Sequence, residues 1–517
     1  MATITLLSEV NRQKRGRATK DIPSARPQVA WILLCWALAF ALLGYHPFAE
    51  DGGIYATGVT LRLHPELFPT ERNLPHSFAI AHTSQSLFVP ALAGLIRVLN
   101  LPQDWAMLLI FAVSLLATLL AAGSLARVLF PSVRSQRWAV LLLAVALGLP
   151  VAGTSLYLAD PYLTARSLWT PLVLYGLSLL LRSRRWSALL CLAVAAPLHP
   201  LMTVWAALLF AAVIARRSAR PALGIVGLAA FALMAMAAVQ VLAPADPTAV
   251  RAASLSRGYW FLARWEWYEL VGLIAAPVLL VYFARPSAMH SPNASSSRDL
   301  AFATAAVAGI AAAGSILLIH PGNTSLLLAR MQPLRLLHPV YLVFVILAGG
   351  LLGDLSRRLR WMPAIACLVT AAGLLFMQRG IYGHSGQWEM PGAVPRNAYE
   401  RAFLWVRSNT PVDAVFAADA DYTDTPSEDA QMFRAVARRT VLPDQAKDGG
   451  VASVVPALAE AWQRGSSLQT GFATASDAER LSRVRALGAT WMLLPATAST
   501  RFACPFQNEA AKVCRLP

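Results

Sequence analysis

The sequence predicts a polytopic α-helical membrane protein of about 11 spans with a C-terminal extracytoplasmic α/β domain. Of its 517 residues, 57% are hydrophobic and only 14% are charged, whereas soluble globular proteins have about 45–50% apolar and about 25% charged residues. Apolar runs that approach the ~20 residues of a spanning helix recur as far as residue 378. From residue 379 onward the composition becomes that of a soluble domain.

The distribution of charge argues against a nucleic-acid-binding protein, although the net charge is +17. No basic stripe is interleaved with aromatic residues over a soluble face, as nucleic-acid binding would require. The basic residues lie in short stretches between apolar runs, which is the pattern of positively charged cytoplasmic loops. These stretches are 12–26, 127–137, 182–185, 216–220 and 357–360.

The basic tail, 1–28, places the N-terminus in the cytoplasm. It is not a cleavable signal peptide, because no small-residue cleavage site follows the first apolar run. That run is a retained span, 29–46, which leads out to a polar loop, 47–82. The later basic stretches agree with one orientation only if the apolar segment 83–99 lies in the interface or re-enters. We therefore expect 83–99 to be a peripheral or re-entrant helix.

The run 186–215 has basic clusters at both ends, so it cannot be one span with both flanks inside. Pro197 and Pro200 interrupt it, and helices are disfavoured just before a proline. We interpret it as two short helices that go out and back, with His199 near the turn. The other spans complete a transmembrane domain over 29–378 and leave the C-terminus outside. They are predicted at 104–126, 138–156, 166–181, 222–243, 266–284, 300–320, 336–353 and 361–378.

The tail, 379–517, alternates helical and strand-like patterns, which is typical of a small α/β layer structure. Helices are expected at 397–408, 427–438, 451–464 and 476–487, and strands at 414–417, 440–442 and 490–494.

The five cysteines do not form a disulfide framework. Cys35, Cys191 and Cys367 lie inside apolar runs and are expected to be inert core thiols. Cys504 and Cys514 lie in the polar tail, where an extracytoplasmic location would favour a disulfide between them.

Two adjacent acids, Glu50 and Asp51, follow the first span directly. An acid at the membrane surface can act as a general base that deprotonates an acceptor hydroxyl. The alternative is that the pair forms a solvated turn and helix cap.

Five further residues are candidates for substrate binding. Asp160 and Arg166 lead into an apolar span, where ionisable groups are costly and often functional, although the two could simply pair with each other. His199 could hydrogen-bond a substrate or hold the helix break. Arg330 and Arg335 are outward basic residues, suited to gripping a lipid phosphate or pyrophosphate. Pairing with an acid from another outer loop is the competing explanation.

Two other patterns receive structural interpretations. The histidines and carboxylates of 64–82 show no recognised metal-ligand spacing, so the sequence predicts no metal site. The aromatic run 260–268 is interpreted as an interfacial girdle.

With these features in place, the chain resembles the GT-C superfamily of integral-membrane glycosyltransferases, which includes protein O-mannosyltransferases and bacterial aminoarabinose transferases of lipid A. The resemblance covers most of the chain. It rests on the acid pair after the first span, the broken hairpin with its His-Pro, the extracytoplasmic tail and three short stretches. Those stretches are Gln-Pro-Leu-Arg at 332–335 and the tail segments 403–411 and 487–491.

The resemblance implies a sugar on a polyprenyl phosphate as donor, an unidentified glycan or lipid as acceptor, and no cofactor. It implies Asp51, with Glu50 next, as the base, and Arg330 or Arg335 on the lipid phosphate. It further implies a bacterial inner membrane. The chain departs from the family pattern at Gly52 and Gly53, which weaken a helix by roughly 1 kcal/mol each relative to alanine.

Three functions compete at this point: a membrane glycosyltransferase, a non-catalytic GT-C-like scaffold or lipid-glycan-binding protein, and a transporter. Transporters usually have two matching halves with corresponding broken helices, whereas this sequence has one broken hairpin. The first two differ in whether Asp51 faces a cavity shared with Arg330 or Arg335.

Overall fold

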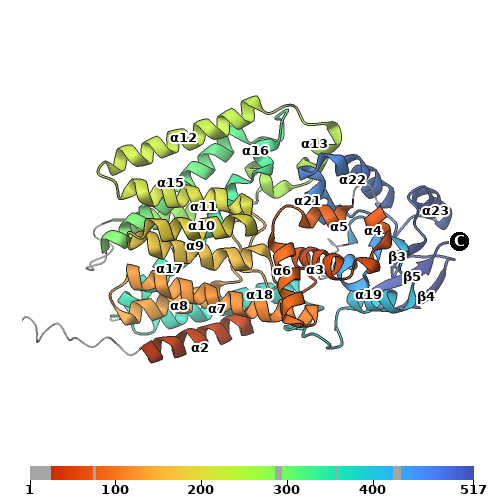
Figure 1. The fold of residues 1–517 in the computed structure, drawn as a ribbon, viewed down its shortest axis with the longest axis horizontal. Helices are drawn as coiled ribbons and strands as arrows, with labels where there is room; N and C mark the ends of the chain where they lie inside the picture. Colours follow the sequence, from red (N-terminus) through yellow and green to blue (C-terminus); the bar gives the residue numbers. More distant parts are fainter. Residues whose placement is uncertain (1–24, 74–76, 286–293, 357, 423–431) are drawn as a thin grey trace, which may run out of the picture.

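The structure is a computed structural model that describes residues 25–73, 77–285, 294–356, 358–422 and 432–517. Figure 1 shows long helices side by side in a bundle, with the C-terminal domain at one end of it. Residues 1–24 of the predicted cytoplasmic tail lie outside the described part of the chain. The bundle helices are α2 (Ala25–Leu43), α7 (Gln103–Leu129), α8 (Val133–Ala146), α9 (Ala165–Leu181), α10 (Arg185–Leu198), α11 (Pro200–Arg216), α12 (Pro221–Leu242), α14 (Trp267–Phe283), α15 (Ala294–Leu318), α17 (Leu337–Leu355) and α18 (Met362–Ile381).

Five stretches of helix among the described residues are long and apolar enough to cross a membrane, by length and composition. Six shorter apolar helices have 10–17 residues. These features support a membrane protein, and the number of about 11 spans stays a prediction. The five long stretches are 103–129, 221–242, 295–318, 327–355 and 362–381.

The broken hairpin predicted for 186–215 is confirmed, since α10 ends at Leu198 and α11 begins at Pro200. Proline suits the first position of α11, because a backbone N–H at that position would have no intrahelical partner. The span predicted for 138–156 is wrong in its second half, because α8 ends at Ala146. An irregular loop, 147–164, follows, closed by a bridge between Pro150 and Tyr157.

The segment predicted to be peripheral or re-entrant, 83–99, contains helix α6 (Phe88–Leu99). Twelve residues of helix extend for about 18 Å, which is short of the ~30 Å hydrocarbon core. Helix α6 therefore cannot cross a bilayer by itself. It packs on α3 (Glu50–Leu63) near the end of the bundle that carries the C-terminal domain (Figure 1).

Short helices fill the space between the bundle and the C-terminal domain (Figure 1). Helix α3 contacts α20 of the domain, α5 contacts α21, and α13 contacts α21 and α22. The segment predicted as a polar loop, 47–82, is thus helical over much of its described length and docked on the C-terminal domain. The short elements are α3, η1 (Pro65–Leu67), α4 (Pro69–Asn73), α5 (Phe78–Thr83), α13 (Thr248–Leu255), η2 (Gly258–Trp260), η3 (Leu262–Arg264), α16 (Leu327–Arg330) and η4 (Pro333–Leu336).

The C-terminal domain has a five-stranded sheet in the order β2-β1-β3-β5-β4, with β1 parallel to β2 and β3, and β5 antiparallel to β3 and β4. The α/β architecture predicted from the sequence is therefore present. Its elements are α19 (Ala398–Asn409), β1 (Val415–Ala417), α20 (Phe433–Ala437), β2 (Thr440–Val441), α21 (Lys447–Val454), α22 (Pro456–Gln469), α23 (Asp477–Arg485), β3 (Trp491–Pro495), β4 (Ala503–Gln507) and β5 (Ala511–Arg515).

Two details of this domain differ from the sequence prediction, and one prediction lies partly outside the described residues. The helix expected at 451–464 is divided between α21 and α22 at Pro456. Of the helix expected at 427–438, the part before residue 432 lies outside the described residues. The hairpin of β4 and β5 was not predicted, although it contains the expected disulfide between Cys504 and Cys514.

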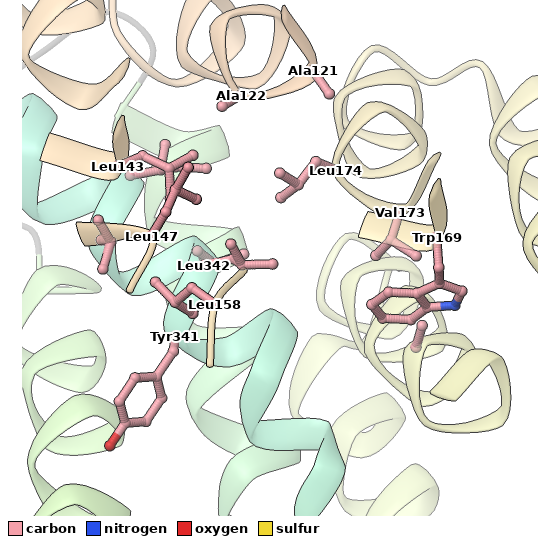
Figure 2. Close-up of a cluster of buried hydrophobic side chains, with 14 of the residues drawn as sticks. Ala121, Ala122, Leu143, Leu147, Leu158, Trp169, Val173, Leu174, Tyr341 and Leu342 are labelled. Carbon is pink, nitrogen blue, oxygen red and sulfur yellow. The ribbon is translucent and has the colours of Figure 1, made fainter. Parts of the chain in front are cut away.

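The largest core lies within the bundle, where α7, α8, α9 and α17 meet. Figure 2 shows Leu174 of α9 near Leu342 of α17 and the small side chains of Ala121 and Ala122 of α7, with Trp169 beside Val173. Small residues let membrane helices approach closely. The loop 147–164 is fixed to this core through Leu158, whose carbonyl accepts a hydrogen bond from His338 Nε2 (3.2 Å).

Candidate functional site

A cavity of about 620 Å³ lies between the bundle and the C-terminal domain. Its walls come from α3, the loop before α9, the break between α10 and α11, the α13–η2 segment, η4 and the start of α21. Asp51 and Arg335 both line it, whereas Arg330 does not. Its charged and histidine residues are Glu50, Asp51, His82, Arg166, His199, Arg257, Arg335 and Lys447.

The acid pair is held by a cation from the C-terminal domain. Lys447 Nζ donates to a carboxylate oxygen of Glu50 and to Asp51 Oδ1 (3.1 Å). Glu50 and Asp51 are the first two residues of α3, and Ala49, which precedes the helix, makes no side-chain cap hydrogen bond, so neither acid is the N-cap. Glu50 has φ +48°, and such strained backbone is concentrated at functional sites.

The two glycines after the acid pair permit close packing. A Cβ atom at Gly52 would lie 2.9 Å from Tyr162 Cβ, and one at Gly53 would lie 2.2 Å from Met432 Cβ. Larger residues would therefore push α3 away from both neighbours. Gly52 therefore permits the contact with the loop before α9, and Gly53 permits the contact with the C-terminal domain.

The cations around Asp51 keep its carboxylate ionised. Burial raises the pKa of Asp51, but the charges of Lys447, Arg166 and Arg335 outweigh burial and lower it below the ordinary value. Burial lowers the pKa of Lys447, and the two carboxylates more than reverse that effect, so its pKa is raised. About a third of the Asp51 side chain is exposed, and this part faces the cavity.

Asp160 and Arg166 form a buried ion pair, with Arg166 Nη2 2.6 Å from Asp160 Oδ2. Thr164 also donates to Asp160 Oδ2 (3.3 Å). The pairing alternative considered for these two residues is therefore what the structure shows. Arg166 still lines the cavity while Asp160 lies behind it.

The structure separates the two candidate phosphate-binding arginines. Arg330 pairs with Asp246, which lies between α12 and α13 (Nη2–Oδ1 2.7 Å), and also contacts Ser254. Arg335 donates to the side chain of Gln332 and, among the described residues, has no carboxylate partner. Arg335 is thus the arginine that is free to bind an anion in the cavity.

His199 lies at the helix break and lines the cavity, so the break places this residue at the site. Among the described residues, no group of three His, Cys, Asp or Glu side chains could hold a metal ion.

The aromatic run 260–268 is divided: Trp267 is 74% exposed, as a girdle residue would be, whereas Trp260 is buried and lines the cavity. The girdle interpretation is wrong for Trp260 and for Trp265, which is also buried.

Lys447 was not recognised from the sequence. Its partners lie almost 400 residues earlier, and no local pattern connects them. One signal was present: the chain has only four lysines among 44 basic residues, and Lys447 stands between acids at 444 and 448. A lysine is unusual in a chain that otherwise uses arginine.

The fold and the cavity are those of a membrane protein with a polar site at the junction of a helical bundle and a soluble domain. No protein-family model and no curated protein matches the chain. Among solved structures, it is similar to the oligosaccharyltransferase AglB from Archaeoglobus fulgidus in complex with an inhibitory peptide and a dolichol-phosphate. The TM-score is 0.50 at 10% identity, over 92% of this chain and 70% of AglB.

Two further structures are similar over most of this chain. A. fulgidus oligosaccharyltransferase tethered to an acceptor peptide matches with a TM-score of 0.43 and 11% identity, over 90% of this chain and 69% of that one. The mycobacterial arabinofuranosyltransferase AftD matches with a TM-score of 0.40 and 15% identity, over 93% of this chain and 37% of that one. These neighbours are GT-C membrane glycosyltransferases. The resemblance predicted from the sequence is confirmed at the level of the fold.

Proposed function

We propose that this protein is a glycosyltransferase that moves a sugar from a polyprenyl-phosphate donor to an acceptor at the outer face of the membrane. The observation that supports this proposal best is that Asp51 and Arg335 line the same cavity. A transferase needs its base and its phosphate-binding group within reach of one substrate, whereas a scaffold does not.

In the proposed reaction, the acceptor hydroxyl binds beside Asp51, which takes its proton as the oxygen attacks the anomeric carbon of the donor sugar. The bond between that carbon and the phosphate oxygen breaks, and the electron pair leaves with the polyprenyl phosphate. Arg335 stabilises the charge on the leaving phosphate, where a guanidinium can donate two parallel hydrogen bonds. Attack from the face opposite the leaving group inverts the anomeric configuration.

The fold comparison supports the donor class, since AglB was solved with a dolichol-phosphate. The alternative function is a non-catalytic lipid-glycan-binding protein of the same fold. This alternative is favoured by the contact of Lys447 with Asp51 Oδ1. An ionised carboxylate whose charge is offset by an ammonium group is a weaker base.

The test is the melting temperature of detergent-purified protein with and without undecaprenyl phosphate. It compares wild type, Asp51→Asn, Arg335→Ala and a control, Arg264→Ala. Arg264 is an exposed outer-loop arginine that does not line the cavity. The proposal predicts that the lipid stabilises wild type, Asp51→Asn and the control, and that Arg335→Ala abolishes the shift. If the lipid stabilises none of the four, the proposed donor is wrong.

A further inference from the structure

We infer that Lys447 is a positioning residue of this site, supplied by the C-terminal domain to bridge Glu50 and Asp51 and to orient the Asp51 carboxylate. Lys447 Nζ engages Asp51 Oδ1. Among the described residues, no hydrogen bond is made to Asp51 Oδ2, which leaves that oxygen to accept from the acceptor hydroxyl. The role of Asp51 in this inference rests on the proposed function. The C-terminal domain then completes the site instead of only covering it.

The residues on either side of Lys447 are fixed from within the domain. Asp444 Oδ1 accepts hydrogen bonds from the backbone N–H groups of Lys447 (2.5 Å) and Asp448 (3.3 Å), which caps the first turn of α21. Asp448 is fully buried and receives two hydrogen bonds from Arg434 (Nη1–Oδ1 3.0 Å, Nη2–Oδ2 2.9 Å). A bidentate pair of this kind fixes orientation as well as position.

Two outer loops of the membrane part hold the same turn. His82 Nε2 lies 3.0 Å from Asp448 Oδ1, and Glu71 Oε1 lies 3.5 Å from Arg434 Nε. Arg257, from the segment after α13, donates to the carbonyls of Gln445 (2.9 Å) and Ala446. The turn that carries Lys447 is therefore attached to both parts of the protein, which is more than a surface lysine requires.

The packing around this turn leaves little room for movement. A Cβ at Gly449 would lie 2.9 Å from the Trp462 ring and 3.0 Å from Arg257 Nη2. The Lys447 side chain is only 18% exposed. A lysine side chain has up to about 2 kcal/mol of rotamer entropy to lose, and here the surrounding structure fixes it in one place.

The charge of Lys447 has a specific consequence for its partners. Adjacent carboxylates repel each other, and burial favours their protonated forms. The charged or titratable groups around Asp51 are Glu50, Tyr55, Asp160, Tyr162, Arg166, His199, Arg335 and Lys447. Lys447 is the largest influence that opposes the effect of burial on the pKa of Asp51. Removing its charge should raise that pKa, while a structural tether without charge should not affect it.

The experiment measures the pH dependence of carbodiimide labelling of Asp51 in the detergent-purified full chain, by mass spectrometry. Carbodiimides react with protonated carboxyl groups, so labelling reports protonation without requiring a substrate. The variants are Lys447→Met, Lys447→Gln, Lys447→Arg and Lys512→Met. Lys512 is a matched control, because it also belongs to the C-terminal domain and donates to a backbone carbonyl, that of Ala498, away from the cavity. Melting temperatures show whether each variant is folded. If Lys447→Met is not folded, Lys447→Gln is the neutral variant that is compared with wild type.

We expect the neutral variants at 447 to be labelled at Asp51 at higher pH than wild type, with several-fold more product at about pH 5, which is above the ordinary pKa of an aspartate. Lys447→Arg and Lys512→Met should label as wild type does. The inference is overturned if the neutral variants keep the wild-type profile, or if Lys447→Arg shifts as far as they do. Because this readout involves no lipid, its failure is distinct from a failure of undecaprenyl phosphate to bind.

Discussion

Replacing Gly53 with alanine should detach the acid-bearing helix α3 from the C-terminal domain. The new Cβ would lie 2.2 Å from Met432 Cβ and 2.7 Å from Phe48 O, whereas ordinary contacts begin at 3.4 Å. The nearest atom belongs to the base of a side chain and cannot rotate away, so the backbone must shift by about 1.2 Å. The hydrogen bond from Met432 N to Phe48 O (3.0 Å) lies at this contact.

The magnitude follows from two opposing effects. Overpacking a close contact costs about 1–3 kcal/mol, and the severity of this clash places it near 3 kcal/mol. Alanine improves helix propensity over glycine by about 1 kcal/mol. The net expectation is a destabilisation of about 2 kcal/mol. The matched control is Gly94→Ala in α6, where a Cβ would meet nothing within 4 Å, so the helix propensity gain should appear alone.

The assay compares melting temperatures in detergent and the hydrogen–deuterium exchange of α20 and α21. Gly53→Ala should melt below wild type and exchange faster in both helices. Gly94→Ala should melt at or above wild type with unchanged exchange. If Gly53→Ala is as stable as Gly94→Ala and exchanges as wild type does, the reasoning about why α3 begins with two glycines is wrong.

Three further predictions concern individual contacts. Arg330→Ala should lower the free energy of unfolding by about 3–5 kcal/mol, because it leaves the Asp246 side chain buried without its partner. Arg335→Ala should have the melting temperature of wild type. Similar losses of melting temperature in the two variants would refute the distinction between these arginines. Reducing the disulfide between Cys504 and Cys514, which are 10 residues apart, should destabilise the C-terminal domain by roughly 2–3 kcal/mol, so Cys504→Ser should lose its sensitivity to reductant in a melting assay. Burial and the charge of Asp448 raise the pKa of Asp444 to about 7; the folded state then binds more protons than the unfolded state between about pH 4 and about pH 7, and stability falls as pH rises through this window. Asp444→Asn should therefore gain melting temperature relative to wild type as pH rises from about 5 to about 8, and a constant difference would contradict this.

Local sequence signals predicted the parts of the fold that depend on local physics. Apolar runs located the bundle helices, and Pro197 and Pro200 located the break at His199. The end of α8 was misplaced because the apolar run continues into the loop 147–164, where Pro150 and tertiary packing end the helix. Hairpin β4–β5 was missed because its strands are short and β4 alternates only between partly and fully exposed positions.

The site could be predicted only as far as its residues lie near the apolar runs. Asp51 and Arg335 were both identified, but the sequence could not separate Arg335 from Arg330. That distinction depends on Asp246, which lies 84 residues before Arg330. Lys447 depends on a contact across 396 residues with Asp51. Long-range pairing of charges leaves no periodic trace in a single sequence.

The central claim is that one substrate reaches Asp51 and Arg335 together. The most direct measurement is a cryo-EM structure of the protein with undecaprenyl phosphate bound. The account predicts density for the phosphate in the cavity, within hydrogen-bond distance of Arg335 and on the side that faces Asp51. A phosphate bound at Arg330, or at any place outside the cavity lined by Asp51, would contradict it.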